Sequence, residues 1–367
     1  MTSISSFVSA IVPFAAVIVS GISLGGVSQT RAIHMNPHID TEKPLAALDY
    51  PGWLSLDGKF IGSYSQHWIG ARNAQSSTWE WWYKVESPLS SPISSLGNGA
   101  IAFGTTDGTI HKLEAATGKL LWKSNIDSFT SKEMVVSGTH VIVMTSRQQV
   151  YSLDIGSGST RWLYDAGAPD SISIRSGVSP YVQNNTVFVG TSDGSVHAID
   201  IEMGKQLWKT SIAEVEGRFH DVVGEFSQIE SGLIFTRYDG LIGMIDLSEG
   251  DHKVLWKEEV GLVSTSTTRS GRLFVGCLNG EVLAFDAMTG KKVWRADTGQ
   301  AIGHIAAFDE DILVAGLRGR LNRVGFSDGK IMWYDDFGGN ISSKPVFLGN
   351  EIFYPTGMKV LYGYNFK

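Results

Sequence analysis

The apolar residues of this chain fall into short runs that are separated by turn-forming dipeptides. In residues 101–122 an apolar run opens at Ile101, Asp107-Gly108 follows, an alternating stretch ends at Glu114, and a loop leads to Trp122. Asp-Gly accepts the positive φ angles of tight β-hairpins, and short apolar runs between turns are typical of strands. The stretch therefore predicts three antiparallel strands.

The same pattern recurs along most of the chain. Residues 141–162, 187–208, 273–294 and 312–333 align with residues 101–122 without a gap, and each ends on a tryptophan. A further copy, residues 233–256, has two additional residues after Gly250, in a turn that tolerates insertion. An apolar stretch precedes each copy and adds a fourth strand. Four-stranded units in series predict a β-propeller.

The number of units determines the number of blades. Six complete units are visible, and a seventh, residues 351–367, ends before any tryptophan-bearing strand. The segment Trp79–Val85 resembles such a strand but has no unit before it. We therefore expect an all-β propeller of four-stranded antiparallel blades, seven in number with eight possible. In this prediction the N-terminal strand Trp79–Val85 completes the last blade and removes an exposed sheet edge.

The residues before the repeats suggest export. Phe7–Val27 contains no charged residue, and the first charged side chain is that of Arg31. Such a segment is typical of a signal peptide or a membrane anchor. We expect residues 1–30 to be a signal peptide or membrane anchor, residues 31–76 an N-terminal linker or extension, and residues 77–367 the propeller.

Charge and cysteine content exclude several classes of function. The net charge is −7 and no dense basic run occurs, so a nucleic-acid partner is not expected. Cys277 is the single cysteine, so neither an intrachain disulfide nor a thiolate metal cluster can form.

The repeat resembles that of the pyrroloquinoline-quinone (PQQ) propellers, most clearly at Ala284–Trp294, where it reads A-x-D-x-x-T-G-K-x-x-W. This resemblance spans residues 79–366 and indicates architecture, because the repeat serves both quinone enzymes and proteins without a cofactor. A narrower resemblance lies at Ser171–Pro180, SISIRSGVSP, which is similar to the Leu-Ser-Leu-Arg segment of the BamB family. The next connection, residues 213–228, is long and acidic as in that family, and the similarity continues through Asp246.

The BamB resemblance implies a noncatalytic periplasmic scaffold of the machinery that inserts β-barrel proteins into the outer membrane. It implies that Ile172 and Ile174 are apolar anchors and that Arg175 is a charged contact for the periplasmic domains of a BamA-like protein. Asp221 and Glu225 would stand for the family's acidic residues. Unfolded outer-membrane proteins are possible clients. No cofactor, metal-binding residue or catalytic residue is implied.

Two features depart from the BamB family. BamB proteins have eight blades, whereas seven are expected here. BamB proteins also have a cysteine for a lipid anchor, whereas no cysteine directly follows the apolar segment of this chain. The protein would therefore lie in the periplasm at the outer membrane, or be anchored by its N-terminal segment. A generic exported protein-binding propeller stays open as an alternative. A PQQ-dependent dehydrogenase is less favoured, because many such enzymes have an adjacent cysteine pair.

The recurring polar and aromatic residues have structural explanations. One tryptophan per blade suits blade packing. His111 and His197 share one repeat position, but other residue types occupy it elsewhere, so a ring of metal ligands is not expected. Carboxylates that precede the glycine loops are expected to accept backbone N–H groups. These carboxylates belong to Asp154, Asp200, Asp246 and Asp286.

Overall fold

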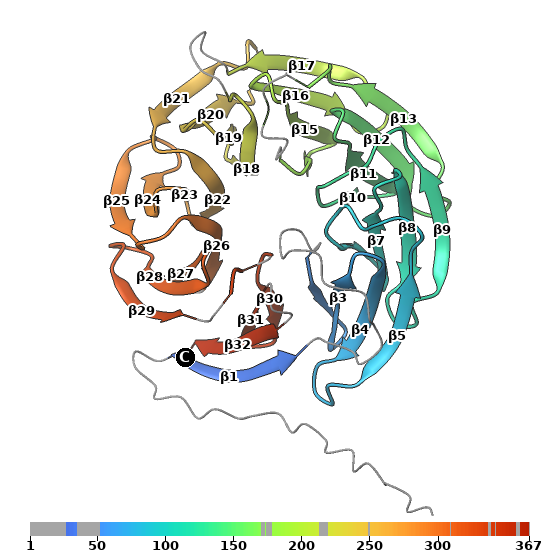
Figure 1. Cartoon of the computed structure of the whole chain (residues 1–367). Helices are drawn as coiled ribbons and strands as arrows, with labels where there is room; N and C mark the ends of the chain where they lie inside the picture. Colours follow the sequence, from blue (N-terminus) through green and yellow to red (C-terminus); the bar gives the residue numbers. More distant parts are fainter. Residues whose placement is uncertain are drawn as a thin grey trace, which may run out of the picture.

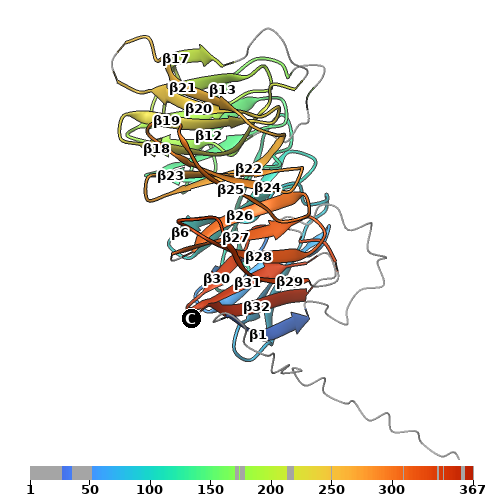
Figure 2. The same cartoon turned by 90° about the vertical axis from the view of Figure 1, so that its left-hand side faces the viewer.

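The computed structural model describes residues 27–34, 52–169, 173, 178–212, 219–248, 250–308, 310–336, 339–341, 343–356 and 360–366. These residues form eight four-stranded antiparallel sheets, which are arranged radially in a closed ring (Figure 1). Figure 2 shows the same ring from the side. The described residues contain no helix, and hence none that could span a membrane. The all-β propeller of four-stranded blades is confirmed.

We number the blades from 1 to 8 and list the strands of each in the order in which they pair, starting at the centre of the ring. Blade 1 contains β2 (Leu54–Leu56), β3 (Lys59–Ser65), β4 (Trp68–Asn73) and β5 (Trp79–Lys84). Blade 2 contains β6 (Ser94–Gly97), β7 (Ala100–Gly104), β8 (Thr109–Glu114) and β9 (Leu120–Asn125). Blade 3 contains β10 (Val135–Ser137), β11 (His140–Met144), β12 (Gln149–Asp154) and β13 (Thr160–Asp165). Blade 4 contains β14 (Tyr181–Gln183), β15 (Thr186–Gly190), β16 (Ser195–Asp200) and β17 (Gln206–Ser211).

The second half of the ring repeats this order. Blade 5 contains β18 (Val222–Ile229), β19 (Gly232–Arg237), β20 (Leu241–Asp246) and β21 (Val254–Glu259). Blade 6 contains β22 (Val263–Arg269), β23 (Arg272–Cys277), β24 (Glu281–Asp286) and β25 (Lys292–Asp297). Blade 7 contains β26 (Ile302–Phe308), β27 (Asp311–Gly316), β28 (Arg320–Gly325) and β29 (Ile331–Asp336). Blade 8 contains β30 (Val346–Leu348), β31 (Glu351–Pro355), β32 (Val360–Phe366) and β1 (Val27–His34).

The ring closes through the two ends of the chain. Strand β1 pairs antiparallel with β32, from Val27 opposite Phe366 to His34 opposite Val360, and the two strands lie side by side in Figure 1. Closure by an N-terminal strand is thus confirmed, but the expected strand was wrong. Trp79–Val85 corresponds to β5, which pairs with β4 and completes blade 1.

The prediction of seven blades was also wrong, because three strands of blade 1 lie within residues that the sequence suggested to be a linker. Strands β2, β3 and β4 occupy this stretch and pair in order. The glycine that marks the loop in other blades is replaced by Ser77, whose φ is +58°. The Ser77 N–H donates to the Asn73 carbonyl, just as the Gly118 N–H donates to that of Glu114. The loop is therefore the same without its glycine.

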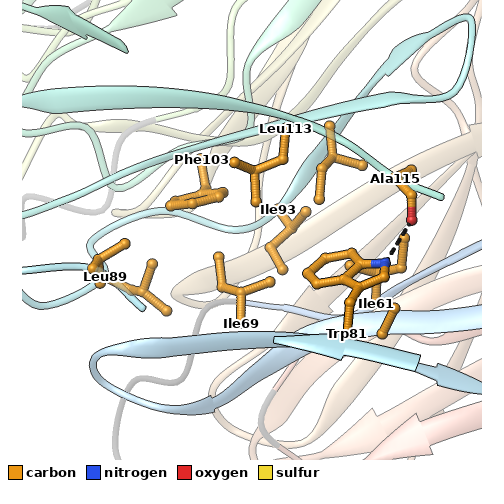
Figure 3. Close-up of a cluster of buried hydrophobic side chains, with 11 residues drawn as sticks. Ile61, Ile69, Trp81, Leu89, Ile93, Phe103, Leu113 and Ala115 are labelled. Carbon is orange, nitrogen blue, oxygen red and sulfur yellow. Dashed lines mark hydrogen bonds between the residues drawn. The ribbon is translucent and has the colours of Figure 1, made fainter. Parts of the chain in front are cut away.

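Tryptophans join neighbouring blades, as expected. The indole N–H of Trp81 in blade 1 donates to the Ala115 carbonyl in blade 2 at 2.9 Å, and the ring packs in a cluster with Ile61, Ile69 and Leu113 (Figure 3). A buried aromatic side chain removes about 150–250 Å² from water, which stabilises by about 4–6 kcal/mol. Trp81 is therefore a major contact between the blades.

The same arrangement explains why five blades have a glycine where the tryptophan of the preceding blade docks. A Cβ atom added at Gly118 would lie 2.5 Å from the Trp81 ring, so a side chain there would displace the indole. Equivalent pairs recur around the ring, each with an indole hydrogen bond to the next blade: Trp122 with Gly158, Trp162 with Gly204, Trp256 with Gly290, and Trp294 with Gly329. The outer strand of blade 8 has no tryptophan, so blade 1 needs no glycine at Ser77.

Candidate functional site

The predicted partner loop connects β13 in blade 3 with β14 in blade 4. Ile172, Ile174 and Arg175 lie outside the described residues. Ser173, between them, is described, and its hydroxyl donates to the Asp221 carboxylate at 2.5 Å. Hydrogen bonds to a charged acceptor are stronger than neutral ones. The structure therefore attaches the middle of this loop to blade 5.

Asp221 differs from the expectation for a surface contact. It directly precedes β18 and is 2% exposed, so a partner protein does not reach it in this conformation. Its backbone carbonyl accepts from the Tyr238 N–H at 2.9 Å, and the residue lines a small cavity of about 50 Å³ together with Lys132 and Ser173. Asp221 thus stabilises the loop through its hydrogen bond to Ser173, from a buried position.

Gln148 supports the same connection from blade 3. Its side-chain N–H donates to the Gly167 carbonyl at 3.2 Å, and its Oε1 accepts from the Ser192 N–H at 2.6 Å. Our sequence interpretation missed this residue, although a signal was present. Gln148 stands where blade 2 has Gly108 and adopts a positive φ of 62°. A non-glycine residue at a position that favours glycine indicates that its side chain has a use.

Glu225 lies at a second location, in the central channel. The channel contains a cavity of about 520 Å³ that is lined by residues from seven of the eight blades. The Lys344 ammonium in blade 8 donates to Glu225 in blade 5 at 2.7 Å and to Glu133 in blade 3 at 3.4 Å. The lining residues are Pro92, Ser131–Val135 without Met134, Val178–Tyr181, Val223–Phe226, Ser264, Thr265, Gly303, His304 and Lys344.

The charges in the channel affect one another. Desolvation lowers the pKa of Lys344, but Glu225 and Glu133 more than offset this, so the pKa is raised overall. Burial, and to a smaller extent repulsion from Lys344, lowers the pKa of Lys132 to about 8. The same two causes lower the pKa of His304 to about 4, so His304 is neutral at pH 7. Two ammonium groups and two carboxylates therefore line this space.

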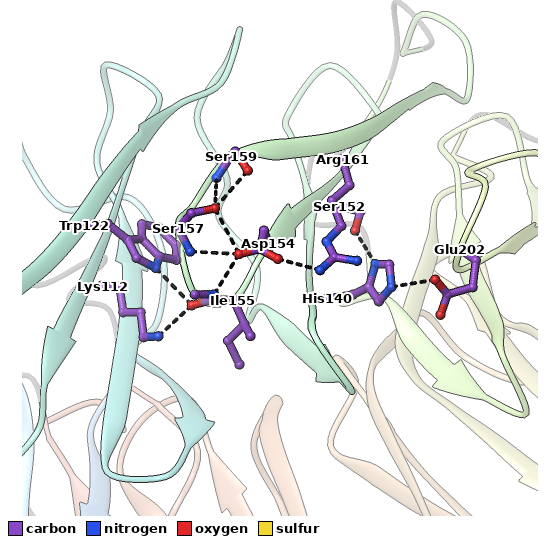
Figure 4. Close-up of polar contacts among 11 residues, drawn as sticks. Lys112, Trp122, His140, Ser152, Asp154, Ile155, Ser157, Ser159, Arg161 and Glu202 are labelled. Atoms are coloured by element: carbon purple, nitrogen blue, oxygen red, sulfur yellow. Dashed lines mark hydrogen bonds and ion pairs between the residues drawn. The ribbon is translucent and has the colours of Figure 1, made fainter.

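The recurring histidines and aspartates form hydrogen bonds within the propeller. Tyr164 of blade 3 and His197 of blade 4 are hydrogen-bonded at 2.8 Å, and within the described ranges no three His, Cys, Asp or Glu side chains are grouped to hold a metal. The Asp154 carboxylate accepts the N–H groups of Gly156 and Ser157, at 3.0 and 2.8 Å (Figure 4). The hydrogen bond from Arg161, and to a smaller extent those from Ser157, lower the pKa of Asp154.

Two potential nucleophiles are inaccessible. The His140 ring is hydrogen-bonded through Nδ1 to the Ser152 hydroxyl at 2.8 Å and through Nε2 to the Glu202 carboxylate at 3.2 Å (Figure 4). A hydroxyl, an imidazole and a carboxylate follow one another in the same order in a hydrolytic triad. However, Ser152 is 0% exposed inside blade 3. Cys277 is equally buried, and burial followed by Glu281 raises its pKa to about 11. Neither side chain can reach a substrate in this arrangement.

Comparison with known proteins gives consistent matches. The family model described as outer membrane protein assembly factor BamB matches residues 66–276 and 278–367. BamB of Moranella endobia is 24% identical over 271 residues, which cover 72% of this chain and 69% of the relative. BamB of Yersinia pestis is 23% identical over 309 residues, covering 76% of this chain and 77% of the relative.

Solved structures share the fold. The crystal structure of BamB from Moraxella catarrhalis matches with a TM-score of 0.79 at 21% identity, covering 93% of this chain and all (100%) of that chain. A europium-containing methanol dehydrogenase matches with a TM-score of 0.74 at 13% identity, covering 93% of each chain. The architecture alone therefore does not separate an assembly factor from an enzyme.

Proposed function

The chain belongs to the family of the outer membrane protein assembly factor BamB, and on this basis we propose that it is a noncatalytic scaffold for outer-membrane protein assembly. The scaffold works in the periplasm at the outer membrane. It binds the periplasmic domains of a BamA-like protein through the loop that contains Ile172, Ile174 and Arg175. Unfolded outer-membrane proteins are its clients.

The attachment of this loop to the propeller is the observation that best supports the proposed binding site. Ser173 is bonded to buried Asp221 from blade 5, and Gln148 holds Gly167 from blade 3. A binding loop that is fixed before its partner arrives loses less conformational entropy on association. Arginine is among the residue types that are enriched in interaction hot spots, and the two isoleucines add aliphatic anchors.

The roles of the two acidic residues are divided in this proposal. Asp221 is a positioning residue that acts through Ser173, because its carboxylate is buried. Glu225 is half exposed at the channel, where Lys344 neutralises part of its charge. Glu225 is therefore the acidic residue that a partner can reach.

The proposal of a noncatalytic role is supported by the buried state of Ser152 and Cys277. A quinone-dependent dehydrogenase is the alternative that the fold allows. Such an enzyme needs a calcium ion beside the quinone, and the described residues of the channel do not group three metal-ligating side chains. The residues present therefore do not fit that cofactor.

Binding of the full chain to the purified periplasmic domains of the BamA-like protein from the same organism tests the proposal. We expect Arg175→Glu to weaken binding at least tenfold without lowering the melting temperature. Lys291→Glu reverses an exposed charge on an outer turn of blade 6 and serves as the matched control. Failure of the wild-type chain to bind, or an equal loss in both variants, would favour the generic binding module.

The Ser173→Ala variant tests the positioning role of Asp221 separately from the direct contacts of the loop with its partner. It removes the hydrogen bond to Asp221 and leaves Ile172, Ile174 and Arg175 in place. We expect binding several-fold weaker than wild type, mainly because more entropy is lost when the loop is ordered. Unchanged affinity would refute the positioning role of Asp221 while leaving the loop assignment intact.

A further inference from the structure

The central channel is large enough to hold a ligand of its own. Its volume of about 520 Å³ lies within the range of about 300–1,000 Å³ that is typical of small-ligand sites. Strands and loops of seven blades converge on it, so its walls are held by the closed ring. A ligand in this space goes beyond the proposed function, because it requires no BamA-like partner, although Glu225 belongs to both.

Lys344 occupies a defined position in this space. Its ammonium lies between Glu225, at 2.7 Å, and Glu133, at 3.4 Å. The three side chains come from blades 8, 5 and 3, so the contact crosses the channel and joins blades that are not neighbours. Within this group two carboxylates share one ammonium, and the second ammonium of the space belongs to Lys132.

These groups stay accessible to solvent. The side chains of Lys344, Glu225 and Glu133 are 50%, 49% and 39% exposed. Ion pairs between such exposed groups contribute little, because water competes for both partners. Another ammonium or guanidinium group can therefore replace that of Lys344 at small cost.

We propose that Glu133 and Glu225 form a receptor for a basic side chain of an extended polypeptide bound in the channel, and that Lys344 occupies this receptor in the free protein. Lys344 shows that a lysine side chain reaches both carboxylates from the channel wall. Displacement of Lys344 thus couples binding of the polypeptide to release of an internal contact.

The remaining lining suits a peptide. Hydroxyl groups of Ser131, Ser179 and Thr265 offer hydrogen bonds to backbone amides, and Tyr181 and Phe226 offer apolar surface. The side chain of Lys132 also lines this space, and its ammonium can donate to peptide carbonyls. A purely anionic ligand is less suitable, because it would face the same two carboxylates.

The test uses the full chain and an end-blocked, fluorescently labelled peptide with the sequence Gly-Ser-Lys-Ser-Gly. We expect the Lys344→Met variant to bind it at least tenfold more tightly than wild type in fluorescence polarisation. Adding Glu133→Gln and Glu225→Gln to that variant should return the affinity to the wild-type level. Lys330→Met, in an exposed turn of blade 7, is the matched control and should leave binding unchanged.

Three results would overturn the proposal. The first is a Lys344→Met variant that binds no better than wild type while its near-ultraviolet circular dichroism is native; Lys344→Gln repeats the test if that variant fails to fold. The second is an equal gain for a peptide with norleucine in place of lysine, since binding would then be apolar. The third is preference for a glutamate peptide, since Lys132 would then define an anion site.

Discussion

The indole of Trp208 stacks on the imidazole of His252, with ring centroids 4.5 Å apart and planes inclined by 24°. In five other blade interfaces the tryptophan lies on a glycine. In blade 5, two additional residues follow Gly250, and a Cβ atom at Gly250 would have no neighbour within 4 Å. The insertion therefore moves the glycine away from Trp208, and His252 takes its place.

This relationship predicts a stability cost for His252→Ala. The variant removes the ring that faces Trp208, and aromatic pairs contribute about 0.5–1.5 kcal/mol beyond the area they bury. We expect the free energy of unfolding in urea to fall by about 1 kcal/mol. His67→Ala, in the turn between β3 and β4, is the control and should have a smaller effect. Equal losses in both variants would contradict a special role for the stacked pair.

The Trp162–Gly204 pair predicts a larger effect. A Cβ atom at Gly204 would lie 2.6 Å from Trp162, and φ at Gly204 is +66°. Gly204→Ala therefore adds overpacking, about 1–3 kcal/mol, to the strain of a left-handed residue, about 1–2 kcal/mol. Gly138→Ala is the matched control, because φ there is +58° and no atom lies within 4 Å. Chemical denaturation should show that Gly204→Ala costs more; equal costs would show that the indole moves freely.

Because β1 closes the ring, we expect truncation of the N-terminus to destabilise the protein only once β1 is removed. Removing residues 1–26 leaves β1 in place, whereas removing residues 1–34 deletes the outer strand of blade 8 and leaves the edge of β32 unpaired. Exposed edges favour pairing between molecules. We expect the longer deletion to melt at a lower temperature and to aggregate in size-exclusion chromatography. Equal behaviour of both truncated chains would show that β1 does not close the ring.

The sequence predicted the architecture wherever the repeat keeps its landmarks. Blades 2 to 7 have a tryptophan and a glycine, at the same spacing in each of them except blade 5, where two residues are inserted. Five indoles of the ring pack on a glycine of the next blade, where a side chain would displace them. Blade 1 was missed because Ser77 replaces that glycine, and it can do so because no tryptophan of blade 8 docks there. Strand β1 was missed because it directly follows the uncharged segment, whose composition suggested export.

The candidate site was less predictable, because it depends on contacts between distant blades. Nothing in the sequence near Asp221 shows that its carboxylate is buried against Ser173. Lys344 lies 119 positions from Glu225 and 211 positions from Glu133, so no local pattern links them. Gln148 is the exception, since its departure from the Asp-Gly turn was visible in the repeat.

His197 and His111 predict how stability depends on pH. The hydroxyl of Tyr164 donates to Gln206 at 2.7 Å, so the Nδ1–H of His197 donates to Tyr164, and Nε2 is buried with no partner among the described residues. A proton on Nε2 would therefore lack an acceptor. Burial, and to a smaller extent repulsion from Lys209, lowers the pKa of His197 to about 4. Burial and repulsion from Lys123 lower the pKa of His111 to about 4 in the same way.

The direction of the effect follows from the two pKa values. The pKa of an unfolded histidine is about 6.5, so between pH 6.5 and 4 the unfolded chain binds more protons than the folded chain. The contribution of each histidine to stability is complete above this range and falls with decreasing pH by up to about 1.4 kcal/mol per pH unit. We expect His197→Leu, which introduces the residue type found at Leu283 of blade 6, to reduce the slope of unfolding free energy against pH. Urea denaturation at pH 7, 6, 5 and 4.5 measures this slope, and an unchanged slope in the variant would show that His197 is protonated in the folded protein.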